Sequence, residues 1–551
     1  MKKRNNLLIR RISIAALCAG MIFSVPSCKK YTNLLPVDAL SNVTSFSTAA
    51  NVELAAAGMY NAAAVGNYSG AAGRGYTFGG ASIEQSEMRG DDMVNIASFY
   101  QITYQATYDA TTANNQNIWV NCYALINQAN TFIAGVQTAL AAGVLTPASA
   151  AAYQGEACFL RALSHHELVI NYCRPYADGA GSNPGVPYRT LAINSQTAVA
   201  AGVSETRGTV AQDYTAILAD LAYAEANLPA ALRATNGITR ASVGAAIALE
   251  SRVRLHMGDW AGVIAAGAKL GVAGNGPVYN APMGPTGGYR LTASPDGPFY
   301  SGIASITPTN NGNNTESIFS IEESSQANGG VNGSLPEMFG TSDRGGRGLV
   351  CTSPNLYNAS FWVSSDTRRT LLQVKQNVAG AMYYFNFKYR DIVTQSDFPP
   401  ILRYAEVLLN VAEANSRLNN LTPALAMLNA VRNRAVAVAD QYNAASFTTS
   451  LAMTQAILNE RRIEFAGEGR RWGDISRLAL DPNFSTGGIP GKILIGQISG
   501  TGSSYDIVNR PIITTFGQAA IPYANFKFIW PIPSVELAVN PTLAQEQNPF
   551  Y

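Results

Sequence analysis

Side chains at helical spacing recur along this chain, and the helices that they predict come in pairs joined by short turns. From Trp119 to Ile133, within residues 112–140, mainly apolar positions follow one another at steps of three and four residues. Residues at that spacing share one face of a helix, so each stripe has to be buried against a neighbouring element. The recurrence of such pairs predicts stacked helical hairpins of the tetratricopeptide-like kind.

Helical and loop-rich stretches alternate along the 551 residues. The expected helices are 46–66, 112–140, 147–173, 207–228, 240–257, 259–270, 399–420, 422–437 and 451–478. From Gly271 to about Pro400 the chain is rich in Gly, Asn, Ser and Pro, with strand-like runs at 316–323 and 383–390. The prediction is a mainly α fold, a tetratricopeptide-like helical repeat scaffold with loop-rich insertions that carry a few short strands.

The first residues have the features of an export signal. Five basic residues precede an apolar segment from Ile12 to Val25, and the run "SVPSC" ends at Cys28. This run resembles a bacterial lipobox, in which the Cys is acylated and becomes the mature N-terminus, so Cys28 is the predicted lipidation site. The alternative is a plain secretory signal cleaved nearby. The predicted parts are 1–27 (signal), 28–270, 271–397 and 398–551.

Charge and cysteine content exclude two classes of protein. Residues 1–27 hold five of the 38 basic residues and none of the 36 acidic ones, so the mature chain has a net charge of −3. A nucleic-acid binder needs a basic face, so no nucleic-acid partner is expected. The four cysteines beyond the signal, Cys122, Cys158, Cys173 and Cys351, are too scattered for a disulfide framework. We expect mostly buried free thiols.

The segment Glu460–Leu478, "ERRIEFAGEGRRWGDISRL", concentrates charge. Nine of its 19 residues are charged, against 13% for the whole chain. On one continuous helix the expected pairs are Arg461–Glu464, Glu468–Arg471 and Arg470–Asp474. Glu464 and Glu468 repel each other unless an Arg from elsewhere lies between them. Carboxylates surrounded by Arg favour a structural role over catalysis.

No enzyme motif is evident in the sequence. The three histidines are His165, His166 and His256, and no His-x-x-x-His or Cys-x-x-Cys spacing appears. Adjacent helical residues such as His165 and His166 point about 100° apart and cannot share one metal. Gly-x-Ser-x-Gly is also absent. A non-catalytic protein without a cofactor or metal is therefore expected.

Several motifs, in the order in which they occur along the chain, resemble those of a known protein family. They are "GEACFLRALSHHELVINYCRPY" (155–176), "TRASVGAAIALESRVRLHMGDW" (239–260), "RYAEVLLNVAEANSRLNN" (403–420), the charged segment, and "IWPIPSVELAVNPTLAQEQNPFY" (529–551). Together they resemble the SusD/RagB family of outer-membrane nutrient-binding lipoproteins of Bacteroidetes. In the last motif Phe550 stands where the family usually has Gly.

The resemblance implies a lid over a SusC-like TonB-dependent transporter. Such a protein is anchored in the outer membrane through its lipid, at the cell surface. It captures a glycan or oligosaccharide and hands it over by hinge-like opening and closing. A RagB-like peptide binder and an assembly scaffold without a ligand are the alternatives, and an enzyme is disfavoured by the missing motifs.

A sugar-binding site needs aromatic faces for C–H surfaces and polar groups for hydroxyls. Residues 74–108, in the loop between the first two helices, supply both, and in the family this loop contributes to the ligand face. The irregular block is a second candidate, with Phe299, Tyr300, Asp343, Arg344, Arg347, Tyr357 and Trp362. The predicted ligand-binding residues are Arg74, Tyr76, Arg89, Asp91, Asp92, Asn95, Phe99, Tyr100, Tyr104, Tyr300 and Trp362. The alternative is that most of the aromatics pack against the helices.

Overall fold

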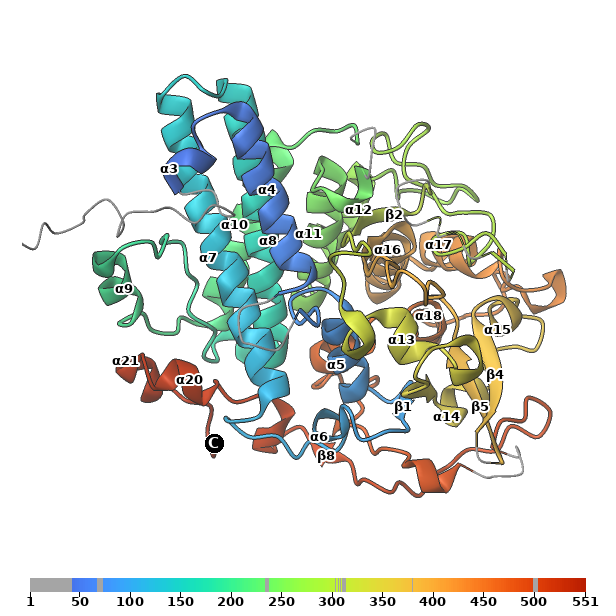
Figure 1. Cartoon of the computed structure of the whole chain (residues 1–551). Coiled ribbons are helices and arrows are strands. Elements are labelled where there is room, and N and C mark those ends of the chain that lie inside the picture. Colours follow the sequence, from blue (N-terminus) through green and yellow to red (C-terminus); the bar gives the residue numbers. More distant parts are fainter. Residues whose placement is uncertain are drawn as a thin grey trace, which may run out of the picture.

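Helices form the body of the protein, and loop-rich segments cover one side of it (Figure 1). The computed structural model describes residues 42–551 except 67–72, 233–236, 303, 306, 308, 310–313, 379 and 499–503. The signal and Cys28 therefore lie outside the described residues. Among the described helices, none is long and apolar enough to cross a membrane.

The helices of the N-terminal part are α3 (Asn42–Ser45), α4 (Ala49–Ala64), α5 (Gly80–Arg89), α6 (Gln101–Tyr104), α7 (Ala113–Ala141), α8 (Pro147–Tyr172), α9 (Gln196–Gly202), α10 (Val210–Asn227), α11 (Val243–Met257) and α12 (Trp260–Lys269). Those that follow are α13 (Leu335–Phe339), α14 (Pro354–Tyr357), α15 (Arg368–Leu371), α16 (Tyr404–Arg417), α17 (Leu421–Arg432), α18 (Ser450–Glu464), α19 (Arg471–Arg477), α20 (Ser534–Leu537) and α21 (Pro541–Ala544). The expected helical scaffold is confirmed.

The long helices pack in chain order. α7 lies against α8, α8 against α10, α10 against α11, α11 against α12, and α12 against α16, which also contacts α17 and α18. Figure 1 shows α4, α7, α8, α10 and α11 side by side in one half of the molecule and α16, α17 and α18 in the other. Small residues permit the close crossings: a Cβ on Gly267 of α12 would lie 2.2 Å from Val411 of α16. Each hairpin thus buries the apolar stripe of the next.

Capping residues fix where the helices of the N-terminal half begin. Thr146 accepts a hydrogen bond from the Ser149 amide and forms a capping box at the start of α8. Thr209 does the same with Gln212 at the start of α10, which ends just before Pro229. These caps satisfy amides that lack a partner in the first turn. The loop between α8 and α10 borders a cleft that is described below.

Short strands join segments that are distant in the sequence. They are β1 (Met93–Asn95), β2 (Ser317–Ser320), β3 (Val350–Thr352), β4 (Gln373–Val378), β5 (Ala381–Asn386), β6 (Pro400–Arg403), β7 (Gly488–Ile489) and β8 (Ile521–Pro522). The antiparallel pairs are β1–β3, β2–β6, β4–β5 and β7–β8. In the first pair Val94 lies opposite Cys351, so the loop after α5 is tied to the irregular block. The predicted boundaries at 270 and 397 stay a prediction.

The prediction of one continuous helix over 451–478 is wrong, because the helix is interrupted between α18 and α19. Gly467 and Gly469 adopt φ values of +78° and +72° there, a left-handed conformation that ends a helix. None of the three expected ion pairs forms: two of them have a residue in the break, and Glu464 pairs with Arg434 and Arg403 rather than with Arg461. Arg461 instead contacts Asp474 across the break at 2.9 Å.

A buried ionic network fills the space between α18 and the strands. The Arg403 guanidinium contacts three carboxylates, those of Glu316 at 2.5 Å, Glu464 at 3.0 Å and Glu468 at 2.8 Å. An Arg does therefore lie between Glu464 and Glu468, as expected. Burial alone would raise the pKa of Glu464, but the nearby guanidiniums of Arg434 and Arg403 hold this pKa well below its usual range. The charged segment thus has the expected structural role.

Candidate ligand-binding sites

The predicted site residues on α5 and after it lie mostly inside the protein. All ten residues of α5 are buried. The Arg89 guanidinium lies 3.5 Å from the ring centroid of Trp472 and 4.6 Å from that of Trp530. It donates to Asn171 Oδ1 at 2.8 Å and to the Phe528 carbonyl at 2.6 Å. Arg89 therefore joins α5 to α8, α19 and the C-terminal segment.

Asp91 and Asp92 connect the same loop to the charged segment. Asp92 accepts from Arg462 at 2.5 Å, and Asp91 accepts from Arg471 at 2.7 Å. Asp92 is 1% exposed, whereas Asp91 is partly exposed. Both carboxylates are thus paired with guanidiniums before any ligand arrives.

Six further predicted residues are below the surface: Tyr76, Asn95, Tyr100, Tyr104, Tyr300 and Trp362, each at most 6% exposed. The Tyr104 hydroxyl donates to the Ile493 carbonyl at 2.7 Å, and the Tyr300 hydroxyl donates to Asp397. The Arg369 guanidinium lies over the Trp362 ring at 4.4 Å. Their contribution to ligand binding stays a prediction, and in this structure they support the loops from beneath.

Arg74 and Phe99 keep exposed surface, and here the two candidate segments meet. The Phe99 ring centroid is 5.7 Å from Cζ of Arg74 and 5.1 Å from Cζ of Arg347, which belongs to the irregular block. Arg347 is held by hydrogen bonds to the Val331 carbonyl at 2.9 Å and to Asn332 Oδ1 at 2.8 Å. We call Arg74, Phe99, Asn332 and Arg347 the Phe99 surface.

The arginines of the Phe99 surface are not neutralised by the protein. Neither Arg74 nor Arg347 forms an ion pair with a carboxylate in the described part of the chain. Glu84 of α5 is nearby but fully buried, and burial raises the pKa of its carboxyl well above the usual range. The guanidinium N–H groups of Arg74 and Arg347 that are not bonded within the protein can donate to ligand oxygens.

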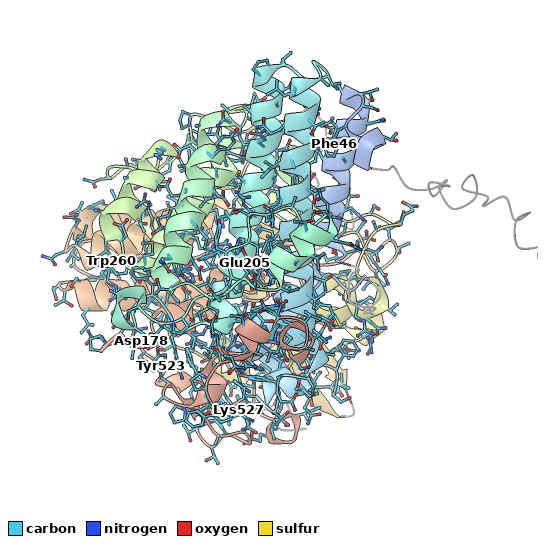
Figure 2. All side chains as sticks on the ribbon, turned by 90° about the vertical axis from the view of Figure 1, so that its left-hand side faces the viewer. Phe46, Asp178, Glu205, Trp260, Tyr523 and Lys527 are labelled. Atoms are coloured by element: carbon cyan, nitrogen blue, oxygen red, sulfur yellow. The ribbon has the colours of Figure 1, made fainter. Side chains whose placement is uncertain are left out.

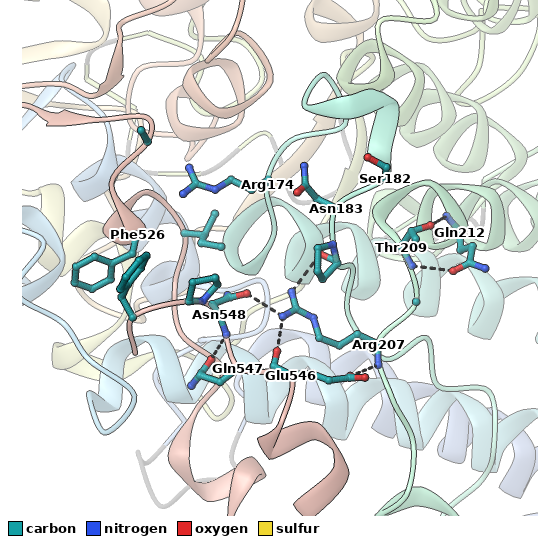
Figure 3. A pocket seen from close by; sticks show the side chains of 16 residues that line it. Arg174, Ser182, Asn183, Arg207, Thr209, Gln212, Phe526, Glu546, Gln547 and Asn548 are labelled. Carbon is teal, nitrogen blue, oxygen red and sulfur yellow. Dashed lines mark hydrogen bonds between the residues drawn. The ribbon is translucent and has the colours of Figure 1, made fainter.

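A cleft of about 600 Å³ lies elsewhere, where the C-terminal segment meets the start of α10 (Figure 3). It is lined by Arg174, Ser182, Asn183, Pro184, Arg207, Gly208, Thr209, Gln212, Ala524, Phe526, Ile529, Glu546, Gln547, Asn548, Pro549 and Phe550. Its volume falls within the range of about 300–1,000 Å³ typical of small-molecule sites. We call it the C-terminal cleft.

Hydrogen bonds hold both walls of the C-terminal cleft. The Arg207 side chain donates to the Gly185 carbonyl at 2.5 Å, to the Glu546 carbonyl at 2.8 Å and to Asn548 Oδ1 at 2.9 Å. Figure 2 shows Asp178, from the loop between α8 and α10, next to Tyr523 of the C-terminal segment, and the Tyr523 hydroxyl donates to Asp178 at 2.6 Å. The cleft is therefore largely formed before a ligand binds.

The histidines and cysteines are packed in the interior. Burial lowers the pKa of His166 to about 3, so this ring is neutral and packs edge-on against His256 at 5.0 Å. The four described cysteines are free and buried, as expected. Within the described residues, no group of three or more His, Cys, Asp or Glu side chains has the arrangement of a metal site.

Two family models match separate halves of the chain. Residues 373–551 match the model described as "SusD family", and residues 43–255 match the one described as "Starch-binding associating with outer membrane". The chain belongs to the SusD family. No curated protein matches it.

Solved structures of the SusD superfamily share the fold along nearly the whole chain. A protein from Bacteroides fragilis is 25% identical with a TM-score of 0.71, and the match covers 90% of this chain and 99% of the other. One from Bacteroides thetaiotaomicron is 22% identical with a TM-score of 0.69, covering 91% and 100%. A laminarin-binding SusD-like protein is 20% identical with a TM-score of 0.62, covering 92% and 100%.

Sequence reasoning did not find the C-terminal cleft of this SusD-family protein. Its two walls, around Thr209 and Phe550, are more than 300 residues apart in the sequence, and no motif links them. One signal was present: Phe550 occupies a position where the family motif usually has Gly. Likewise, the contact of Phe99 with Arg347 depends on the β1–β3 pairing, which no local pattern specifies.

Proposed function

We propose that this SusD-family protein captures an oligosaccharide on the Phe99 surface and delivers it to a SusC-like TonB-dependent transporter. A lipid on Cys28 holds it in the outer membrane at the cell surface. The family supports carbohydrate binding at the outer membrane. The observation that carries the proposed site is the partly exposed Phe99 ring, over which lie two guanidiniums that pair with no carboxylate among the described residues.

The chemistry of the Phe99 surface suits a sugar. The exposed part of an aromatic ring packs against the C–H groups of a sugar ring. Guanidinium N–H groups donate to hydroxyls, and the Asn332 side chain offers an amide as well. Arg347 is fixed by its bonds to residues 331 and 332, so little side-chain entropy is lost when a ligand binds.

Capture without catalysis is consistent with the state of the carboxylates. Asp91, Asp92 and Glu464 are each paired with Arg side chains, and Glu84 is buried below the surface. A glycosidase needs two carboxyls facing each other across a substrate cleft. We therefore propose binding followed by handover, with no bond made or broken.

Calorimetric titration with laminarihexaose and maltohexaose tests the proposed site. Phe99→Ala is expected to weaken binding about tenfold, because it removes a well-packed aromatic contact with the ligand. Phe516→Ala is the matched control, because Phe516 is 41% exposed but lies outside the Phe99 surface. Unchanged binding by Phe99→Ala would remove the proposed site, and binding of peptides but of neither hexasaccharide would favour the RagB-like alternative.

A further inference from the structure

The C-terminal cleft has two chemically different walls. The C-terminal segment contributes the apolar residues Phe526, Pro549 and Phe550 to the lining, and Figure 3 shows Phe526 on this side. Asn183, Ser182 and the turn that opens α10 form a polar side. A ligand that fills this cleft therefore needs one face of C–H groups and another of hydrogen-bonding groups.

Phe550 is in an unusual state for a large apolar residue. Its φ is +70°, in the left-handed region, and its side chain is 87% exposed. That conformation is unfavourable for any residue with a Cβ, and Gly at this position would avoid the strain. The ring contacts Phe526 with a centroid distance of 6.0 Å. Strain retained at an exposed aromatic residue on the edge of a cleft indicates a binding function.

The charged side chains of the cleft are already hydrogen-bonded to other groups of the protein. The Arg207 side chain is used on protein carbonyls and Asn548, and Arg174 donates to the carbonyls of Tyr523 and Asn525. Glu546, on the same rim, accepts a hydrogen bond from the Arg207 amide at 2.8 Å and offsets one of the two guanidinium charges. A neutral ligand rich in hydroxyl groups fits this mixture of donors and acceptors.

We propose that the C-terminal cleft is a second carbohydrate-binding site, separate from the Phe99 surface. A sugar ring packs its C–H face on Phe550 and Phe526. Its hydroxyls bond to Asn183 on the opposite wall and to the Glu546 carboxylate of the C-terminal segment. The proposal shares with the proposed function only the class of ligand, because the two sites have no residue in common.

The test measures binding and stability in the same variants. Phe550→Gly removes the ring and relieves the backbone, so the unfolding temperature is expected to rise while the dissociation constant at the cleft increases about tenfold. Phe550→Tyr keeps an aromatic face and is expected to retain binding. Both are titrated with laminarihexaose, maltohexaose and xylohexaose in the Phe99→Ala background, which isolates the cleft.

The outcomes separate the two sites. Residual binding in the Phe99→Ala protein that is lost in Phe99→Ala/Phe550→Gly supports the cleft, even if Phe99→Ala alone has no effect and the Phe99 surface fails. Phe526→Ala, on the same wall, is expected to show the same loss. Equal binding with and without the Phe550 ring, or no binding of any of the three hexasaccharides in the Phe99→Ala background, would overturn the second site.

Discussion

Arg403 is the residue on which the buried ionic network depends most. Arg403→Ala leaves the carboxylates of Glu316, Glu464 and Glu468 with one guanidinium fewer in a site that is almost inaccessible to solvent. Removing one partner from a buried ionic cluster costs about 3–5 kcal/mol. We therefore expect the urea concentration at the unfolding midpoint to be lower for Arg403→Ala than for the wild-type protein. Lys269→Ala is the control: its ammonium is 41% exposed and pairs with Glu225, and its loss should cost less than about 1 kcal/mol.

Glu87 on α5 is expected to make stability depend on pH. Burial, together with the nearby Asp92, raises the pKa of this carboxyl from 4.5 to about 8. The folded protein holds the proton more tightly than the unfolded chain, so the contribution of Glu87 is full below about pH 4.5 and is lost as the pH rises toward 8.

Glu87→Gln tests that linkage, since Gln stays neutral and can still accept from the Gly469 amide, which bonds to Glu87 at 2.7 Å. The free energy of unfolding of the variant should rise relative to wild type between about pH 5 and 8, by at most roughly 1.4 kcal/mol per pH unit. Urea denaturation at several pH values measures the difference. A difference that does not change with pH would show that Glu87 is already ionised in the folded protein.

For single residues, the sequence indicated which side chains could bind a ligand, but not whether those side chains are buried or already paired with protein groups. Asp91, Asp92 and Arg89 were expected to face a ligand, but Asp92 and Arg89 are each 1% exposed and all three are paired with protein groups. Polar residues in a loop between helices normally lie in solvent. Here the loop after α5 lies beneath the irregular block, and only tertiary structure determines that.

The turn between α18 and α19 packs against α5. Gly469 has a φ of +72°, and a Cβ there would lie 3.2 Å from Cα of Ile83 on α5. Gly469→Ala is therefore expected to lose about 1–2 kcal/mol from the backbone conformation, with more from the contact with α5.

Gly143, just after α7, provides a matched control for that substitution. Its φ is also +72°, but a Cβ there would have nothing within 4 Å. Gly143→Ala should therefore show the backbone cost alone. The difference between the two unfolding midpoints measures how tightly the turn packs on α5, and equal losses would mean that α5 shifts to accommodate the methyl group.

Most of the long helices followed from the sequence, whereas α5, β6 and the break after α18 did not. The range 112–140 became Ala113–Ala141, and 147–173 became Pro147–Tyr172, because an uninterrupted stripe indicates both helices and a capping residue marks the start of the second. The stretch 74–108 was expected to be a loop but contains α5, and the expected helix 399–420 begins with the residues of β6. In 451–478 the apolar stripe and the charges appeared continuous. Gly467 and Gly469 interrupt it, and the ionic contacts with Arg403 and Arg368 come from distant segments.

For the molecule as a whole, the family resemblance supplied what local patterns did not. Periodicity predicts hairpins but not how the irregular block folds back on them. The pairing of β1 with β3 brings Phe99 to Arg347, and the return of the C-terminal segment to α10 forms the cleft. Both are contacts between distant segments, whose partners must be found among many alternatives with similar local preference.

The attachment of the whole protein to the membrane is predicted to depend on Cys28. An acylated Cys28 would provide the hydrophobic attachment, at about 0.8 kcal/mol per buried CH₂. In a Bacteroides host, Cys28→Ala should move the protein from the membrane pellet to the soluble fraction and abolish palmitate labelling. Cys122→Ala, at a buried thiol, is the control and should change neither. Retention of Cys28→Ala in the pellet after a carbonate wash, with wild-type protein unlabelled, would mean that a protein partner rather than a lipid holds the chain.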